Sequence, residues 1–233
     1  MGWSLPKTKA DFAGYIDQTA LRLGATREDI KASVREAAAR GLLAVCVPPN
    51  LVPTARRVAV GATIKVATVV SFPLGADVAA VKAAEARSVC DRGADEIDVV
   101  INVAAARSAE VDLIADEVAA IRQAVASYGS VLKAIIEAPL LTPDQMIGAA
   151  LAVERGGADI VSTSTDFPGL HLRPVTAGDI RMLREVLGAE TGIEARGGIT
   201  STEDAIAAFE SGATRVGTAN GLAVLEGFDA YLR

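Results

Sequence analysis

The stretch GADEIDVVINV, residues 93–103, contains the pattern that decides the fold. Gly93 comes just before an apolar run that we predict to be a strand over 95–101. A glycine in this place favours a left-handed helix end that turns the chain into the next strand. The same pattern recurs at Gly41, Gly157 and Gly212, each one or two residues before a new apolar run. Such repetition is typical of parallel strands that alternate with helices.

Eight apolar runs rich in Val, Ile and Ala alternate with stretches of helical periodicity. The predicted strands lie near 15–19, 43–47, 64–70, 95–101, 131–136, 159–163, 192–196 and 214–218, after a short helix near 8–14. Eight strands predict a closed (β/α)8 TIM barrel, with residues 1–233 as a single domain. The alternative, a doubly wound open sheet, would need fewer units or a glycine-rich phosphate fingerprint after the first strand. The stretch YIDQTALRLG, residues 15–24, has no such fingerprint.

Polar residues mark the predicted helix starts. Thr26 with Asp29, Thr142 with Gln145 and Thr176 with Asp179 each resemble an N-cap followed by a polar residue three positions later. These pairs place the helices between the predicted strands.

Composition limits the partners and the compartment. The chain has 23 Lys and Arg against 29 Asp and Glu, a net charge of -6, which disfavours binding to nucleic acid or to an anionic membrane. The opening MGWSLPKTKADF lacks the apolar stretch of a signal peptide, and no run reaches the roughly 18 apolar residues of a membrane span. We therefore expect a cytoplasmic protein whose two cysteines, Cys46 and Cys90, are reduced.

The active site of such a barrel forms at the C-terminal ends of its strands. Side chains alternate along a strand, so residues two apart share a face. The polar residues that we expect on lumen-facing positions are Glu96 with Asp98 and Asn102, Lys133 with Glu137, Ser162 with Ser164, and Glu194 with Arg196.

Eight motifs follow one another along nearly the whole chain. They are IDQTAL at 16–21, AVCVPP at 44–49, KVATVVSFPLGA at 65–76, GADEIDVVINV at 93–103, LKAIIEAPLLT at 132–142, STST at 162–165, ARGGI at 195–199 and RVGTANG at 215–221. Together they resemble the motifs of the deoxyribose-phosphate aldolase family. The resemblance implies a class I aldolase barrel, which commonly pairs as a homodimer. In that family one lysine forms a Schiff base with the substrate carbonyl, a second lysine lowers the pKa of the first, and an aspartate moves protons.

The resemblance places the two lysines at positions that carry other residues here. The Schiff-base position is Ser162, whose hydroxyl cannot form an imine, and the position of the second lysine is Glu194. Residues usual in the family remain at Asp17, Cys46, Asp98, Lys133 and Glu137.

The phosphate-binding residues of the family are also altered. Asp166 stands where the family has a glycine near the phosphate, and Ala219 and Asn220 stand where it usually has serines. A carboxylate and a phosphate a few ångströms apart repel by about 4 kcal/mol at an effective dielectric of 20. The backbone donors that remain are Gly197, Gly198 and Gly217. We therefore expect that deoxyribose 5-phosphate is not the substrate.

Three functions fit these residues. The first is non-imine acid-base catalysis on a small carbonyl compound, by a lyase or a cyclase. The expected proton carriers are Asp98, Glu137 and Glu194, and the expected oxyanion donors are Lys133, Ser162 and Arg196. The expected ligand-binding residues are Asp17, Cys46, Ser164, Asp166, Gly197, Gly198, Gly217 and Asn220. The second is a Schiff-base aldolase that uses a displaced lysine, either Lys133 or Lys65. The third is an inactive barrel that binds a ligand or a partner, with its charges forming an inert salt-bridge network.

Two further expectations concern charge and cofactors. Lys133 lies four residues before Glu137, so it should sit lower in the barrel and pair with Asp98 or Glu194. The chain has one histidine, His171, in a loop, so we predict neither a metal site nor another cofactor. The added carboxylates Asp166 and Glu194 suggest a ligand with an amine or several hydroxyls, and Arg196 suggests a ligand carboxylate.

Overall fold

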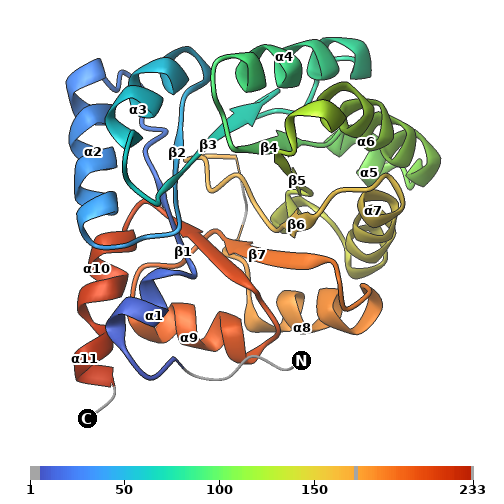
Figure 1. The fold of residues 1–233 in the computed structure, drawn as a ribbon. Helices are drawn as coiled ribbons and strands as arrows, with labels where there is room; N and C mark the ends of the chain where they lie inside the picture. Colours follow the sequence, from blue (N-terminus) through green and yellow to red (C-terminus); the bar gives the residue numbers. More distant parts are fainter. Residues whose placement is uncertain (1–5, 171–172, 232–233) are drawn as a thin grey trace.

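A computed structural model describes residues 6–170 and 173–231 of the chain (Figure 1). Eight parallel strands follow one another around a closed barrel, and β8 pairs with β1 through Val216 and Ile16. The strands are β1 (Ile16–Thr19), β2 (Ala44–Val47), β3 (Lys65–Val70), β4 (Glu96–Val100), β5 (Val131–Ile135), β6 (Ile160–Ser162), β7 (Gly192–Arg196) and β8 (Arg215–Thr218). The predicted (β/α)8 barrel is confirmed, and each strand lies within the range expected from the sequence.

Helices surround the strands in Figure 1. They are α1 (Lys9–Ala13), α2 (Arg27–Ala39), α3 (Val52–Ala59), α4 (Ala79–Asp91), α5 (Val103–Arg107), α6 (Val111–Val125), α7 (Pro143–Arg155), α8 (Ala177–Val186), α9 (Thr202–Glu210), α10 (Gly221–Glu226) and α11 (Phe228–Tyr231). Three 3-10 turns, η1 (Pro49–Leu51), η2 (Ala126–Tyr128) and η3 (Ala138–Leu140), complete the connections. The helix expected near 8–14 is α1. No helix in the ranges 6–170 and 173–231 has the length and apolarity to span a bilayer.

The predicted helix boundaries are also confirmed. Thr26, Thr142 and Thr176 each accept a hydrogen bond from the backbone N–H three residues later, and the side chain of that later residue accepts one from the backbone N–H of the cap. Gly41, Gly93, Gly157 and Gly212 have φ angles of 70°, 99°, 85° and 107°, the left-handed conformation in which a side chain is unfavourable. The N-cap threonines therefore set where these helices begin, and the left-handed glycines follow where helices end.

The two faces of the barrel wall differ in chemistry. Outward-facing strand residues such as Ile97, Val99 and Ile193 pack in the main apolar core, between strands and helices. Inward-facing residues of β1, β4, β5, β7 and β8 are charged and almost completely buried. Of the polar side chains expected in the lumen, the barrel brings together those of Glu96, Asp98, Lys133, Glu194 and Arg196.

Candidate active site

Lys133 is the centre of the charged lumen. Its Nζ lies 2.8 Å from Asp17 Oδ2, 3.1 Å from Glu96 Oε2, 3.2 Å from Asp98 Oδ1 and 3.2 Å from Glu194 Oε1. The expected pairing with Asp98 or Glu194 is confirmed, and two further carboxylates join it. The partners come from three strands, Asp17 from β1, Glu96 and Asp98 from β4, and Glu194 from β7, so one ammonium group on β5 links four strands.

These contacts fix the protonation state of Lys133. Burial opposes its charged form, but the carboxylates of Asp17, Asp98 and Glu194 outweigh burial and raise the Lys133 pKa well above its usual value. A protonated ammonium has no lone pair with which to attack a carbonyl. The geometry therefore argues against Lys133 as a displaced Schiff-base lysine.

Lys65, the other displaced-lysine candidate, lies at the wrong end of the barrel. It is the exposed first residue of β3, and it lines a cavity of about 160 Å³ with Asp95 and Glu96 at the N-terminal ends of the strands. The expected active site is at the opposite, C-terminal end. This position argues against Lys65 as the displaced nucleophile.

Arg196 fills the lumen next to Lys133. Its Nη2 lies 2.7 Å from Asp98 Oδ2 and its Nε lies 3.6 Å from Glu194 Oε2, while its side chain is only 1% exposed. A Cβ atom on Gly217 of β8 would lie 2.5 Å from Arg196 Nε, closer than real atoms approach. Gly217 thus makes room for the arginine, a role different from the phosphate contact that the sequence suggested.

Arg215 holds the lower part of the same cluster. Its Nη2 lies 2.6 Å from Asp17 Oδ2 and 2.8 Å from Glu96 Oε2. Sequence reasoning did not select Arg215, although it lies two residues before Gly217 on the same face of its strand. Burial is the main cause that raises the pKa of Asp17 to about 6, against the opposing charges of Lys133 and Arg215.

Glu194 is an ionised carboxylate in this cluster. Burial would raise its pKa, but Arg196 and Lys133 outweigh burial and hold it below the usual value. Both of those cations already contact Glu194, so its charge is neutralised within the protein. It is therefore poorly placed to bind the amine of a ligand.

Four buried side-chain donors among the described residues lack hydrogen-bond partners: Ser162 Oγ, Arg196 Nε, Arg196 Nη1 and Arg215 Nε. Ser162 on β6 and Arg196 on the adjacent β7 bring two of them, Oγ and Nη1, to neighbouring strands. Both side chains are buried, Ser162 at 0% and Arg196 at 1% exposure. Unpaired buried donors are costly, and they are a frequent feature of sites that bind a polar group.

Glu137 and Asn102 lie outside the charged cluster, contrary to the sequence expectation. Glu137 follows β5 with φ of 51°, and it accepts hydrogen bonds from Ser164 Oγ at 2.6 Å and Thr165 N at 3.0 Å. Asn102 caps α5 by accepting a bond from Ala105 N at 3.0 Å. Both follow the last strand residue, so the alternation of a strand no longer sets their direction. Glu137 thus orders the loop after β6, together with Ser164.

Cys46 connects the charged cluster to an apolar layer. Its Sγ lies 3.5 Å from Asp98 Oδ2, and burial, followed by the charge of Asp98, raises the pKa of the thiol well above its usual value. Cys46 packs in an apolar cluster with Ala67, Val69, Leu21 and Phe72. Cys46 and Cys90 are both free and buried, as predicted.

The remaining expected phosphate-site residues form the rim of the barrel. Gly197 and Gly198 both have φ of 94°, and a Cβ on Gly197 would lie 3.2 Å from Ser164 Cβ. Asp166, with φ of 52°, and Asn220 are exposed. His171 lies outside the described residues. In the part of the chain that the structure describes, no group of three His, Cys, Asp or Glu side chains has the arrangement of a metal site.

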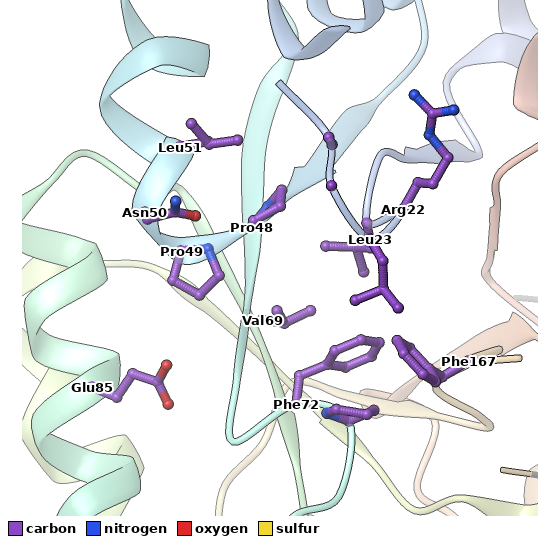
Figure 2. Close-up of a pocket in the computed structure, with 14 residues that line it drawn as sticks. Arg22, Leu23, Pro48, Pro49, Asn50, Leu51, Val69, Phe72, Glu85 and Phe167 are labelled. Carbon is purple, nitrogen blue, oxygen red and sulfur yellow. The ribbon is translucent and has the colours of Figure 1, made fainter. Parts of the chain in front are cut away.

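The mouth of the barrel contains two adjoining cavities of about 490 and 440 Å³. They share the lining residues Leu21, Arg22, Leu23, Phe72 and Phe167. Figure 2 shows the side chains of Leu23, Phe72 and Phe167 next to one another in this wall. Sequence reasoning missed these residues, because apolar residues in loops give no signal that separates a ligand wall from the core.

Comparison with known proteins gives a consistent result. The model of the DeoC/LacD family aldolases matches residues 12–227. A deoxyribose-phosphate aldolase of Streptococcus pneumoniae serotype 2 is 42% identical over 213 residues, which are 91% of this chain and 94% of the relative.

Solved structures agree in fold. The deoxyribose phosphate aldolase of Aeropyrum pernix, described as a unique tetramer, superposes with a TM-score of 0.88 at 33% identity, over 96% of this chain and 93% of its own. A protein of Coccidioides immitis superposes with a TM-score of 0.91 at 29% identity, over 98% of this chain and 89% of its own. The chain therefore belongs to the DeoC/LacD family of aldolases.

Proposed function

We propose that this chain is a carbon-carbon lyase that acts on a small carbonyl compound without forming an imine. The proposal rests on the lack of a neutral amine at the two lumen positions where an imine could form. The family position of the Schiff-base lysine is Ser162, and Lys133 is held protonated by four carboxylates. Catalysis must then use hydrogen bonds and proton transfer.

The lumen contains groups suited to each step of a retro-aldol reaction. Asp98 would accept the proton of the substrate β-hydroxyl, after which the carbon-carbon bond breaks to give an aldehyde and an enolate. Ser162 Oγ and Arg196 Nη1, which have no hydrogen-bond partner among the described residues, would stabilise the enolate oxygen. Asp98 then returns the proton to the enolate carbon, which gives the second carbonyl product and restores the carboxylate. Enolisation or ring closure of a carbonyl compound would use the same groups.

An unphosphorylated substrate fits the rim better than a phosphosugar. Asp166 lines the larger cavity, and Ala219 in the same lining offers no hydroxyl group to a phosphate. Repulsion between a carboxylate and a phosphate dianion would oppose binding. We also propose that the chain forms a homodimer, which light scattering of the purified protein would test.

The test uses 3-hydroxybutanal, whose retro-aldol cleavage gives two molecules of acetaldehyde. We expect cleavage, or exchange of the α-hydrogen in heavy water, by NMR. Borohydride added in the presence of acetaldehyde should give no adduct on any lysine by mass spectrometry. Asp98→Asn should lower kcat by about 100-fold or more while the chain stays folded, whereas Lys65→Met should leave kcat unchanged. A trapped lysine adduct, or preferential cleavage of deoxyribose 5-phosphate, would refute the proposal.

A second candidate function is a binding barrel without turnover. The observation that favours it is the burial of the charged cluster, in which Asp17, Asp98, Lys133 and Glu194 are all 0% exposed. Such a network can be purely structural. Binding of carbonyl compounds with neither cleavage nor hydrogen exchange would select this alternative.

A further inference from the structure

The two mouth cavities adjoin each other above the barrel lumen, and they share part of their lining, which we call the wall. Their volumes, about 490 and 440 Å³, lie in the range of small-molecule sites. The shared residues come from the loops after β1, β3 and β6, so three loops close on the same space. This concave shape suits a small ligand.

The wall is mainly apolar and aromatic. The rings of Phe72 and Phe167 meet edge to face with centroids 5.8 Å apart, and Leu23 beside them is 81% exposed (Figure 2). Pro48 and Pro49 extend this surface in one cavity, and Pro168 extends it in the other. A large exposed leucine beside two phenylalanines in a hollow is typical of a site for an apolar group.

The charges in the wall disfavour a phosphorylated ligand. Asp166 lines one cavity and Glu85 lines the other. The one cation shared by both linings, Arg22, is 3.7 Å from Asp29, and its side chain is 78% exposed to solvent. An anionic ligand in either cavity would therefore meet one carboxylate, whose repulsion does not act on a neutral apolar group.

The wall lies one layer above the charged cluster. Leu21 and Phe72 pack against Cys46, Ala67 and Val69, and Cys46 Sγ is 3.5 Å from Asp98 Oδ2. A ligand that contacts both the wall and Asp98 therefore needs two parts. One is an apolar part that lies against the wall, and the other is a polar end that extends past Leu21, Phe72 and Cys46 into the lumen.

We propose that the mouth cavities bind the aromatic or branched-alkyl tail of the substrate, against Leu23, Phe72 and Phe167. This inference rests on the proposed function for the reaction, and it adds the substrate class: an uncharged β-hydroxy carbonyl compound with an apolar tail. Burial of the tail supplies the binding free energy that a phosphate group would otherwise supply.

The first experiment compares three substrates: 3-hydroxy-3-phenylpropanal, 3-hydroxybutanal and deoxyribose 5-phosphate. Cleavage of the first gives benzaldehyde and acetaldehyde, so the phenyl ring reports on the cavity wall. Because it adds several buried carbons to the methyl compound, we expect its kcat/KM to be about tenfold higher or more. Equal values for the phenyl and methyl substrates, or a higher value for the phosphorylated sugar, would overturn the inference.

The second experiment changes the wall without touching the charged cluster. Phe167→Ala and Leu23→Ser should each raise the Kd of 3-phenylpropan-1-ol, measured by NMR titration, by about tenfold. Val60→Ser provides the matched control, because Val60 is 78% exposed at the end of α3 and outside both linings. Thermal unfolding of all three variants establishes that they are folded.

The alcohol probe separates the two proposals because it cannot react as a carbonyl compound. Binding that weakens in the wall variants supports the inference even if no aldol is cleaved, and that result would count against the proposed function alone. Cleavage of 3-hydroxybutanal without binding of the alcohol would do the reverse. An alcohol Kd unaffected by both wall variants also overturns the inference.

Discussion

Single side chains in the lumen are coupled because each charge has several partners. Lys133 contacts four carboxylates, and Arg196 and Arg215 together contact the same four. A buried charge that loses its partners retains its desolvation cost. Removal of one cation therefore destabilises all the carboxylates that it contacts.

Lys133→Met should destabilise the chain strongly. The four carboxylates would keep only the two arginines, so we expect the free energy of unfolding to fall by about 3–5 kcal/mol. Urea denaturation at neutral pH measures it. Lys65→Met, on the exposed end of β3, should change stability by less than about 0.5 kcal/mol. A similarly small effect at Lys133 would show that the network contributes little.

At the scale of elements, Glu137 joins the end of β5 to the loop after β6. It accepts hydrogen bonds from Ser164 Oγ and Thr165 N, and that loop supplies Asp166 and Phe167 to the mouth. The order of the cavity wall therefore depends on a carboxylate outside the wall.

Glu137→Gln should loosen this loop. An amide offers one acceptor oxygen in place of two, so one of the two donors loses its partner. We expect hydrogen exchange of the Thr165 amide to become about tenfold faster or more. Glu190→Gln, at an exposed site between α8 and β7, is the control. Unchanged protection of Thr165 would contradict this role for Glu137.

The sequence predicts elements well where the determinants are local. Local sequence is sufficient for three features: the strands, the helix caps at Thr26, Thr142 and Thr176, and the glycines at helix ends. Each depends on residues within a few positions of one another. Glu137 was misplaced because its backbone leaves the strand conformation at φ of 51°, and its partners lie 27 and 28 residues away. The apolar mouth was missed because loops from β1, β3 and β6 meet only in the folded barrel.

At the scale of the whole molecule, stability should depend on pH through Asp17. Its pKa rises from 3.8 to about 6 on folding, with burial as the main cause. A raised carboxyl pKa contributes stability below about pH 4, and the contribution is lost as pH rises through about 6. For a shift of about two pH units the loss is on the order of 3 kcal/mol.

The Asp17→Asn variant isolates this contribution. Glu96 and Glu194 have lowered pKa values, so their contribution has the opposite sign: it is present above about pH 4.5 and lost at lower pH. The difference in unfolding free energy between wild type and Asp17→Asn removes their part. That difference should become less favourable to the wild type between pH 4.5 and pH 7.5, and a flat difference would refute the shift.

The contact between Arg196 and Gly217 has a consequence for the evolution of this barrel. A Cβ at 217 would lie 2.5 Å from Arg196 Nε, so any larger residue there would force the guanidinium to move from its present position. A lysine regained at 162 would also stand beside Glu194, its neighbour in the β6–β7 register, and would be held charged and unreactive. Imine chemistry at position 162 would therefore need a change at Glu194 as well as a lysine at 162.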